Sequence, residues 1–171
     1  MKRSLLIIGA GGHGRVVAEV AKDCGYEEIA FLDDSSEEAI GKIDEMKMFT
    51  SLYKETFVAI GNNQVRGEIL EQLKSAGYKI PVLVHPTAYI SRMAKIQRGT
   101  VVEPKAIVNT NADISEGCII SVGAIIDHDT KLERCVHINA GAVVKAGTSV
   151  PQYQRVDAGM VWSQVRDEKR G

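Results

Sequence analysis

Residues 100–126, TVVEPKAIVNTNADISEGCIISVGAII, hold the pattern that decides the fold of this chain. An aliphatic residue returns there at every sixth position, at Val102, Val108, Ile114, Ile120 and Ile126. The phase continues in both directions, so that every sixth position from 90 to 156 is aliphatic. Because an α-helix repeats every 3.6 residues, this period cannot be helical and indicates short strands joined by corners.

Two other positions of the six-residue unit, or hexad, are also specialised. The position two before each aliphatic residue is mostly small, as at Ala88, Ala94, Ala106, Ala112 and Ala124. Residues two apart on a strand share a face, so each hexad directs one small and one branched side chain inward. A third position carries residues that tolerate tight bends, namely Gly99, Asn111, Gly117, Gly123, Asp129, Gly141, Gly147 and Gly159.

This pattern resembles the hexapeptide-repeat acyltransferases, and the resemblance implies a left-handed, triangular parallel β-helix. Three hexads make one coil of about 18 residues, which predicts about four coils over residues 84–162. Proteins with this fold also include carbonic anhydrases, binding proteins and plain scaffolds. The fold therefore favours acyl transfer without establishing it.

The segment before the repeat, residues 1–83, has the pattern of an α/β unit. Apolar residues 3–9 predict a buried strand, and Gly9, Gly11 and Gly14 at its end match G-x-G-x-x-G. Asp33 and Asp34 follow about 20 residues later, as this nucleotide-binding pattern requires. The other elements that we expect are strands over 29–33, 57–60 and 81–84 and helices over about 13–24 and 64–75.

The glycine motif has a clear chemical use. Glycines let the backbone approach a pyrophosphate, the helix N-terminus attracts the anion, and an acid accepts hydrogen bonds from the ribose. The alternative is a tight strand-to-helix turn that binds no ligand. The unit is about half of a Rossmann-type dinucleotide fold, without a second half for a nicotinamide. We therefore expect a nucleotide-sugar, with its sugar reaching toward the β-helix.

Four motifs together resemble one family. GAGGHG at 9–14, FLDD at 31–34, AIGNN at 59–63 and DHD at 127–129 are similar to bacterial sugar acetyltransferases of the sialic-acid and bacillosamine type. The resemblance covers residues 2 to about 147 and is strongest to N-acetyltransferases of UDP-4-amino-4,6-dideoxy sugars. It implies acetyl transfer from acetyl-CoA to a UDP-linked amino-sugar for surface glycan biosynthesis. It also implies a homotrimer with active sites between subunits.

The resemblance assigns roles to individual residues. It implies that His128 is the catalytic base, that Asp129 is its acidic partner, and that His137 is a second active-site histidine that contacts substrate. The residues that it places around the nucleotide are Gly11, Gly12, His13, Asp33, Asp34, Gly61 and Asn62.

The chemistry is consistent with these roles. Amide formation needs a neutral amine, and a histidine with a pKa near about 6.5 can take the proton. A neighbouring carboxylate can orient the ring. The tetrahedral intermediate needs a donor such as a backbone N–H, for which the corners at Gly141 and Gly147, on the acetyl-CoA side, are candidates.

The spacing of the two histidines carries separate information. His128 and His137 lie nine residues apart, half a coil, so they should occupy different sides of the prism and meet only between subunits. Simpler roles stay open: His128 as a solvated corner residue, His137 as an interface residue and His13 as a capping residue. We expect His85 to be structural.

The chain departs from the family pattern after Gly147. Gln154 and Met160 break the small-residue rule, so we expect a terminal cap, a shortened groove for acetyl-CoA and a solvated charged tail over 163–171. Because of this departure, a non-catalytic nucleotide-sugar-binding trimer remains an alternative interpretation. Sialic-acid O-acetylation is a further alternative, because the same histidine can activate a hydroxyl. A metal enzyme is least favoured, because a β-helical carbonic anhydrase site needs three histidines.

The composition excludes several other classes. With 21 basic and 22 acidic residues, the chain has no charge excess for nucleic acid or a membrane surface. No apolar run approaches the roughly 20 residues of a membrane span. Three cysteines give neither a disulfide framework nor a zinc knuckle. We expect a soluble, cytoplasmic protein without a bound metal.

Overall fold

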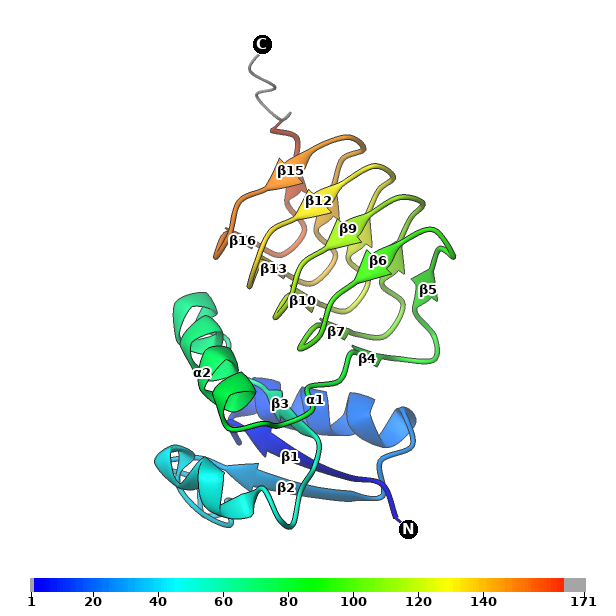
Figure 1. The fold of residues 1–171 in the computed structure, drawn as a ribbon. Coiled ribbons are helices and arrows are strands. Elements are labelled where there is room, and N and C mark those ends of the chain that lie inside the picture. The colour runs from blue at the N-terminus through cyan, green and yellow to red at the C-terminus, as the bar shows by residue number, and fades with distance from the viewer. Residues whose placement is uncertain (1, 165–171) are drawn as a thin grey trace.

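The hexads form a left-handed parallel β-helix in a computed structural model that describes residues 2–164 (Figure 1). Each hexad contributes a two-residue strand. The strands are β4 (Leu83–Val84), β5 (Tyr89–Ile90), β6 (Lys95–Ile96), β7 (Val101–Val102), β8 (Ile107–Val108), β9 (Asp113–Ile114), β10 (Ile119–Ile120), β11 (Ile125–Ile126), β12 (Lys131–Leu132), β13 (His137–Ile138), β14 (Val143–Val144), β15 (Ser149–Val150), β16 (Arg155–Val156) and β17 (Val161–Trp162).

The strands stack into the three faces of a prism. Face 1 has the order β16-β13-β10-β7-β4, face 2 the order β17-β14-β11-β8-β5, and face 3 the order β15-β12-β9-β6. Each strand pairs in parallel with the strand 18 residues away, as Ile119 does with Val101 and with His137. The coil length predicted from the hexads is therefore correct.

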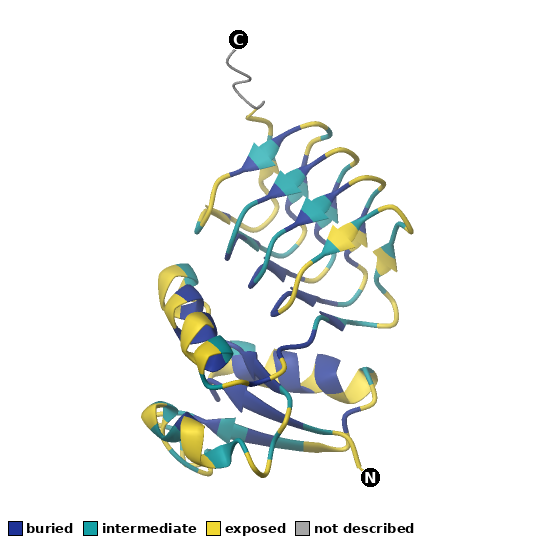
Figure 2. Ribbon diagram, viewed as in Figure 1, coloured by how far each residue is buried: buried dark blue, intermediate teal, exposed yellow. Residues whose placement is uncertain are grey.

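The interior and the corners follow the hexad positions. Branched residues such as Ile120 and small ones such as Ala124 are fully buried in one core along the prism axis (Figure 2). The corner position has positive φ at every coil, and non-glycine residues occupy it too, with φ of 57° at Asp129 and 54° at Cys135. The corner therefore imposes a left-handed backbone on any residue placed there, which favours Gly, Asn and Asp.

The coils continue to Trp162, so the expectation of a cap after Gly147 is wrong. β16 pairs with β13 and β17 with β14 in unbroken register. Gln154 and Met160 occur at the small-residue position because they lie on the last described coil, where both are exposed. The predicted charged tail lies outside the described residues from position 165 onward.

The N-terminal unit is a three-stranded parallel sheet with helices on both faces. Its order is β2-β1-β3, formed by β1 (Ser4–Ile8), β2 (Glu28–Leu32) and β3 (Thr56–Val58). The helices are α1 (Gly12–Asp23) and α2 (Asn63–Ser75), both close to prediction, and a 3-10 helix, η1 (Ile43–Phe49), which was not predicted. Leu5 and Ile7 pack in the core with α1, while Leu6 and Ile8 pack in the core with α2 and η1. This double burial explains why the first strand is continuously apolar.

The two parts share one core. Outward residues of face 1, including Val101 and Ile119, pack in the same cluster as Val17 and Val20 of α1. Helix α1 is thus held between the small sheet and the β-helix (Figure 1). This packing brings the carboxyl ends of β1 and β3 next to face 1. No described helix is long and apolar enough to cross a membrane.

Candidate active site

The glycine motif forms a tight turn between β1 and α1. Gly9 has a φ of 104°, and a Cβ there would lie 2.8 Å from the carbonyl oxygen of Ala59. A Cβ on Gly14 would lie 2.1 Å from the carbonyl oxygen of Gly9, whereas one on Gly11 would meet nothing within 4 Å. The first and third glycines are therefore required by packing, and the second leaves the backbone open to a ligand, as in dinucleotide-binding turns.

Asp33 organises this loop from the end of β2. Its Oδ2 accepts a hydrogen bond from the Ala10 amide at 2.8 Å, and its Oδ1 accepts from the amides of Ser35 and Ser36. These bonds, that from Ala10 first, hold the pKa of Asp33 below its ordinary value. Asp34 accepts from the Ile43 amide at 3.0 Å. Both acids therefore shape the rim of the loop, beside a hollow of about 300 Å³ that they help to line.

The loop after β3 completes this edge. In the strand order β2-β1-β3 the neighbours of β1 lie on opposite sides, so the carboxyl ends of β1 and β3 form the crevice in which such sheets bind ligands. Gly61 lies in this loop with open space at its Cβ position. Asn62 caps α2 by accepting from the amides of Gln64 and Val65, both at 3.1 Å.

His13 and His137 lie near one another where this crevice touches face 1, close enough for His13 to act on the pKa of His137. Nδ1 of His13 lies 3.9 Å from Oε1 of Glu103, and Nε2 of His137 lies 3.2 Å from Oγ of Ser121. His13 Nε2 and His137 Nδ1 are buried without a hydrogen-bond partner among the described residues. Burial, with the nearby Arg66 cation second, lowers the pKa of each histidine to about 4. Both rings are thus neutral at pH 7.

His128 lies on a different corner, between β11 of face 2 and β12 of face 3. Its Nδ1 lies 2.7 Å from Oδ2 of Asp129, and its backbone amide donates to Oδ1 of Asp127 at 2.8 Å. The hydrogen bond to Asp129 raises the pKa of His128. One coil earlier, Asn109 and Asn111 donate to Asp127 and Asp129. These contacts fix both acids, and among the described residues Nε2 of His128 has no hydrogen-bond partner.

The structure therefore brings His13 and His137 together and keeps His128 apart from them. Asp127 lies at the same corner as His128, and its Oδ1 accepts a hydrogen bond from Asn109 at 3.1 Å. Among residues 2–164, no group of three or more histidine, cysteine or acidic side chains is arranged to hold a metal ion.

The amides of the two glycine corners are not free. Gly141 N–H donates to Val122 and Gly147 N–H donates to the carbonyl of His128, at 3.0 and 2.9 Å. Neither can be the oxyanion donor that we considered from the sequence, because the ladder between coils already uses each amide. The amide of Ala146, beside Gly147, finds no acceptor among residues 2–164. It is one coil, 18 residues, from His128.

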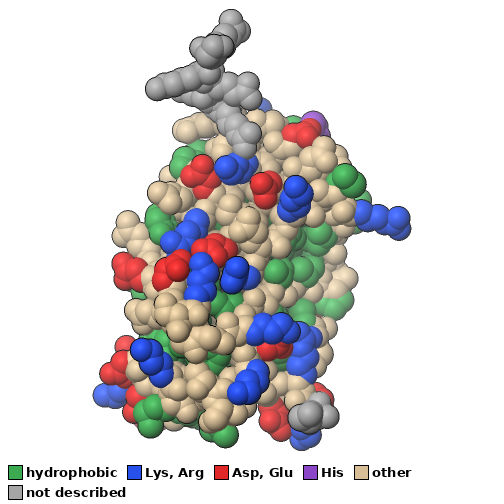
Figure 3. All heavy atoms as spheres, in the orientation of Figure 1, with side chains coloured by type: hydrophobic (Ala, Val, Ile, Leu, Met, Phe, Trp, Pro, Cys, Tyr) green, Lys and Arg blue, Asp and Glu red, His purple; other side chains and the backbone are tan. Residues whose placement is uncertain are grey.

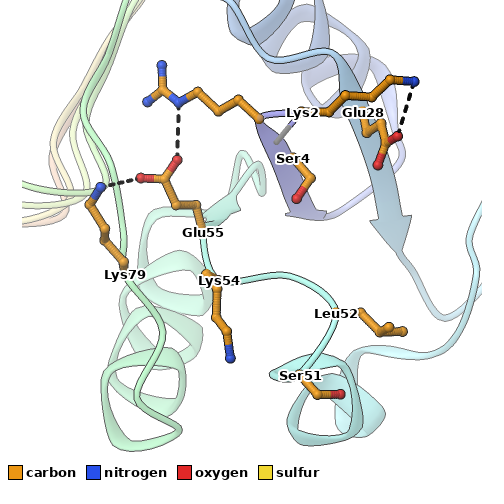
Figure 4. A pocket seen from close by; sticks show the side chains of 9 residues that line it. Lys2, Ser4, Glu28, Ser51, Leu52, Lys54, Glu55 and Lys79 are labelled. Atoms are coloured by element: carbon orange, nitrogen blue, oxygen red, sulfur yellow. Dashed lines mark hydrogen bonds and ion pairs between the residues drawn. The ribbon is translucent and has the colours of Figure 1, made fainter.

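A larger hollow than the one beside Asp33 and Asp34 lies elsewhere. It measures about 1010 Å³ and is lined by Lys2, Arg3, Glu28, Glu55 and Lys79 among others (Figure 4). These residues lie at or near the amino ends of the three strands, opposite the crevice. Glu55 is paired there with Arg3 at 3.3 Å. The hollow is therefore not part of the site built by the glycine loop.

Three residues of the site region were missed from the sequence. Arg66 lies on the same helix as the buried Ile69, Leu70 and Leu73. Its spacing from them places it on the apolar face of the helix, so its burial could have been predicted from the sequence. Glu103 is buried by contacts between distant segments, and the free amide of Ala146 emerges only from a full account of the backbone hydrogen bonds. No local pattern marks these two.

Comparisons with known proteins agree with this architecture. Residues 4–73 match the family model described as the PglD N-terminal domain. A UDP-N-acetylbacillosamine N-acetyltransferase of Bacillus subtilis (strain 168) is 31% identical over 110 residues, which cover 58% of this chain. The matched stretch spans only about half, 51%, of that protein.

Two similarities are to solved structures. The acetyltransferase domain of PglB from Neisseria gonorrhoeae FA1090, in complex with acetyl coenzyme A, is 37% identical with a TM-score of 0.91. That match covers 96% of this chain and 83% of the other. A histidine-to-alanine mutant of GDP-perosamine N-acetyl transferase from Caulobacter crescentus, in complex with CoA and GDP-perosamine, is 25% identical with a TM-score of 0.84. That match covers 95% of this chain and 89% of the other.

Proposed function

This chain belongs to the bacterial sugar acetyltransferases of the sialic-acid and bacillosamine type, and we propose that it transfers an acetyl group from acetyl-CoA to the amine of a UDP-linked 4-amino-4,6-dideoxy sugar for surface glycan biosynthesis. The observation that carries the proposal is the His128–Asp129 pair with a free Nε2, on a β-helix joined to a nucleotide-type glycine loop. Both features are needed, because the histidine–aspartate pair suits proton transfer and the glycine loop suits binding of the nucleotide that carries the sugar.

In the proposed reaction His128 is the general base. The sugar amine attacks the thioester carbonyl carbon, and its proton passes to Nε2 of His128. Asp129, bonded to Nδ1, holds the ring with Nε2 outward and stabilises the imidazolium. When the C–S bond breaks, the imidazolium returns the proton to the departing CoA thiolate. The products are the acetamido sugar and CoA, with His128 neutral again.

The tetrahedral intermediate needs a hydrogen-bond donor near His128, and the amide of Ala146 meets this need. Gly147 N–H donates to the His128 carbonyl at 2.9 Å, which places the corner 145–148 directly beside the base. The Ala146 amide in that corner has no acceptor among the described residues. A fixed donor of this kind stabilises developing negative charge without reorganisation.

We also propose that the working unit is a homotrimer. Strands β4, β7 and β10 of face 1 pack against α1, and the outward residues of face 3 include the charged Lys95, Asp113 and Lys131. Figure 3 shows basic and acidic side chains over the side of the molecule that it views. Face 2 instead presents an uncovered apolar ladder, formed by Tyr89, Ile107, Ile125, Val143 and Val161. Tyr89 is 60% exposed and Val161 55%, and burial of this ladder against neighbouring chains would remove it from water.

The trimer would also complete the active site. His128 lies where face 2 ends, whereas His13 and His137 lie against face 1 of the same chain. Packing of neighbouring prisms along face 2 supports a site with His128 from one subunit and the nucleotide crevice from another. Acetyl-CoA would lie along the same junction, and we propose the cytoplasm, where both co-substrates are made, as the location.

An acetyl-transfer screen with acetyl-CoA tests the proposal. The acceptors are UDP-4-amino-4,6-dideoxy sugars, UDP-3-amino sugars and sialic acid, compared between wild type and His128→Ala. We expect turnover of a UDP-4-amino sugar that is lost in His128→Ala while UDP binding, measured by calorimetry, persists. His85→Ala is the matched control, because His85 pairs with Asp23 away from the site.

Each other outcome has a defined meaning. Equal turnover by wild type and His128→Ala would remove His128 from its role. Transfer only to sialic acid would replace the proposed acceptor with a hydroxyl. Binding of UDP without any binding of acetyl-CoA would refute an enzyme and indicate a nucleotide-sugar-binding protein.

A further inference from the structure

Arg66 is the largest of the fully buried side chains, with only 1% of its surface exposed. Its guanidinium donates to the carbonyl oxygens of Ile60, Gly117 and Cys135 at 2.7–2.8 Å and to Oδ1 of Asn63 at 2.7 Å. These four acceptors and a fifth, the Gly61 carbonyl at 3.4 Å, are neutral, and no carboxylate lies within 4 Å of the guanidinium among residues 2–164. A buried cation without a counter-ion is costly, so its retention calls for a reason beyond packing.

The acceptors come from two parts of the molecule. Ile60 and Asn63 flank the nucleotide loop between β3 and α2, whereas Gly117 and Cys135 are corner residues of successive coils. Asn63 reaches the β-helix itself, donating to the Tyr153 carbonyl at 2.8 Å. One planar fork therefore fixes the loop that holds Gly61 and Asn62 against the β-helix. Lysine, a single point donor, cannot reproduce this geometry.

The same charge acts on the two buried histidines. Burial first and Arg66 second hold the pKa of His13 and that of His137 at about 4. The other groups that face these rings are few. Glu103 lies by His13 and Ser121 by His137. His13 and Arg155 also lower the pKa of His137, and Asp157 raises it.

We infer that Arg66 is a positioning residue of the nucleotide-sugar site, whose planar guanidinium fixes the Gly61–Asn62 loop on the β-helix and whose charge acts on the buried His13 and His137 rings. Neutral rings can each accept a hydrogen bond from a sugar hydroxyl or amide, which an imidazolium cannot. The inference rests on the proposed function for the identity of the ligand. The protonation of the rings is independent of that identity.

Three variants separate geometry from charge. Arg66→Lys keeps the charge and loses the fork, Arg66→Gln keeps some donors and loses the charge, and Arg134→Gln is the control. Arg134 also ties α2 to the β-helix, through the Gly67 carbonyl at 3.0 Å, but it is neutralised by Glu71 and Glu116. The readouts are UDP binding by calorimetry and histidine titration by NMR from about pH 8 to about pH 5.

We expect both Arg66 variants to weaken UDP binding about tenfold or more, whereas Arg134→Gln leaves it within about twofold. In Arg66→Gln alone, the pKa of His13 and that of His137 should rise toward the titrated range, because the contribution of the Arg66 charge is lost while burial remains. If Arg66→Gln does not fold, Arg66→Lys tests the fork against the control. UDP affinity and ring titration that are the same as in Arg134→Gln would overturn the inference. Absence of UDP binding in wild type would refute the proposed function instead, and the ring titration would still decide the role of the charge.

Discussion

The His128 imidazole and the Asp129 carboxylate lie 2.7 Å apart at one corner of the β-helix, although the two residues are neighbours in sequence. The corner makes this possible, because Asp129 adopts a φ of 57°. We predict that Asp129→Asn lowers kcat by about 10²-fold or more, because the ring loses its orienting acceptor. Asparagine tolerates the same backbone conformation, so the fold should persist. Steady-state kinetics and circular dichroism of the variant check both statements.

The pH profile of Asp129→Asn gives a second reading. The hydrogen bond to Asp129 raises the pKa of His128, so its loss should move the acidic limb of kcat/KM to lower pH. Asp127→Asn is the comparison, because Asp127 accepts from the His128 amide and raises the pKa of His128 only through its charge, so its acidic limb should shift less. A profile that shifts equally in both variants would show that Asp129 has no specific role.

The Ala146 amide can be removed without removing a side chain. Pro86 and Pro104 occupy the same hexad position as Ala146, so this corner accepts proline. We predict that Ala146→Pro lowers kcat by about 10²-fold with little change in KM or in melting temperature, because only the oxyanion donor is lost. Ala158→Pro, at the same hexad position two corners later, should leave kcat unchanged. Equal kcat in wild type and Ala146→Pro would exclude this amide from catalysis.

Most of the fold was readable from the sequence because its determinants are local. The hexad sets side-chain direction, coil length and corner conformation, and the alternation continues past Gly147 to Trp162. The small-residue rule failed at Gln154 and Met160, which are exposed on the last described coil. The length of the β-helix was therefore predicted better by the six-residue spacing of the aliphatic residues than by that of the small residues.

The candidate site was predicted only in part, for the same physical reason. His128, Asp129 and the glycine loop belong to short motifs, and the sequence contains them whole. Glu103 and Arg66 gain their surroundings from the contact between α2, the loops after β1 and β3, and face 1. Such contacts join residues 51 to 90 positions apart, which no local pattern reports.

The apolar ladder of face 2 predicts an assembly-dependent activity. Ile125 lies at its centre, paired with Ile107 and Val143. We expect Ile125→Glu to convert the trimer to monomers and to lower turnover at least about 100-fold, because a charge in an apolar interface is strongly unfavourable. Sedimentation and kinetics measure the two effects. Lys95→Glu, the control on face 3, should change neither. A fully active Ile125→Glu monomer would contradict a site shared between subunits.

The buried imidazole of His13 makes a prediction about stability in acid. Burial lowers its pKa to about 4 in the folded protein, while the unfolded chain keeps a pKa near about 6.5. Between these values the unfolded state binds more protons, so stability is retained above about pH 6.5 and lost as the pH falls toward about 4. We expect His13→Gln, which cannot be protonated, to reduce the loss of unfolding free energy between about pH 7 and pH 5 by about 1–2 kcal/mol. Urea denaturation at both pH values measures this difference.

His85→Gln is the matched control, because that histidine pairs with Asp23 outside the crevice. If His13→Gln and wild type lose equal stability, His13 is protonated without cost in the folded state, and the burial that keeps it neutral beside Glu103 is not maintained in solution.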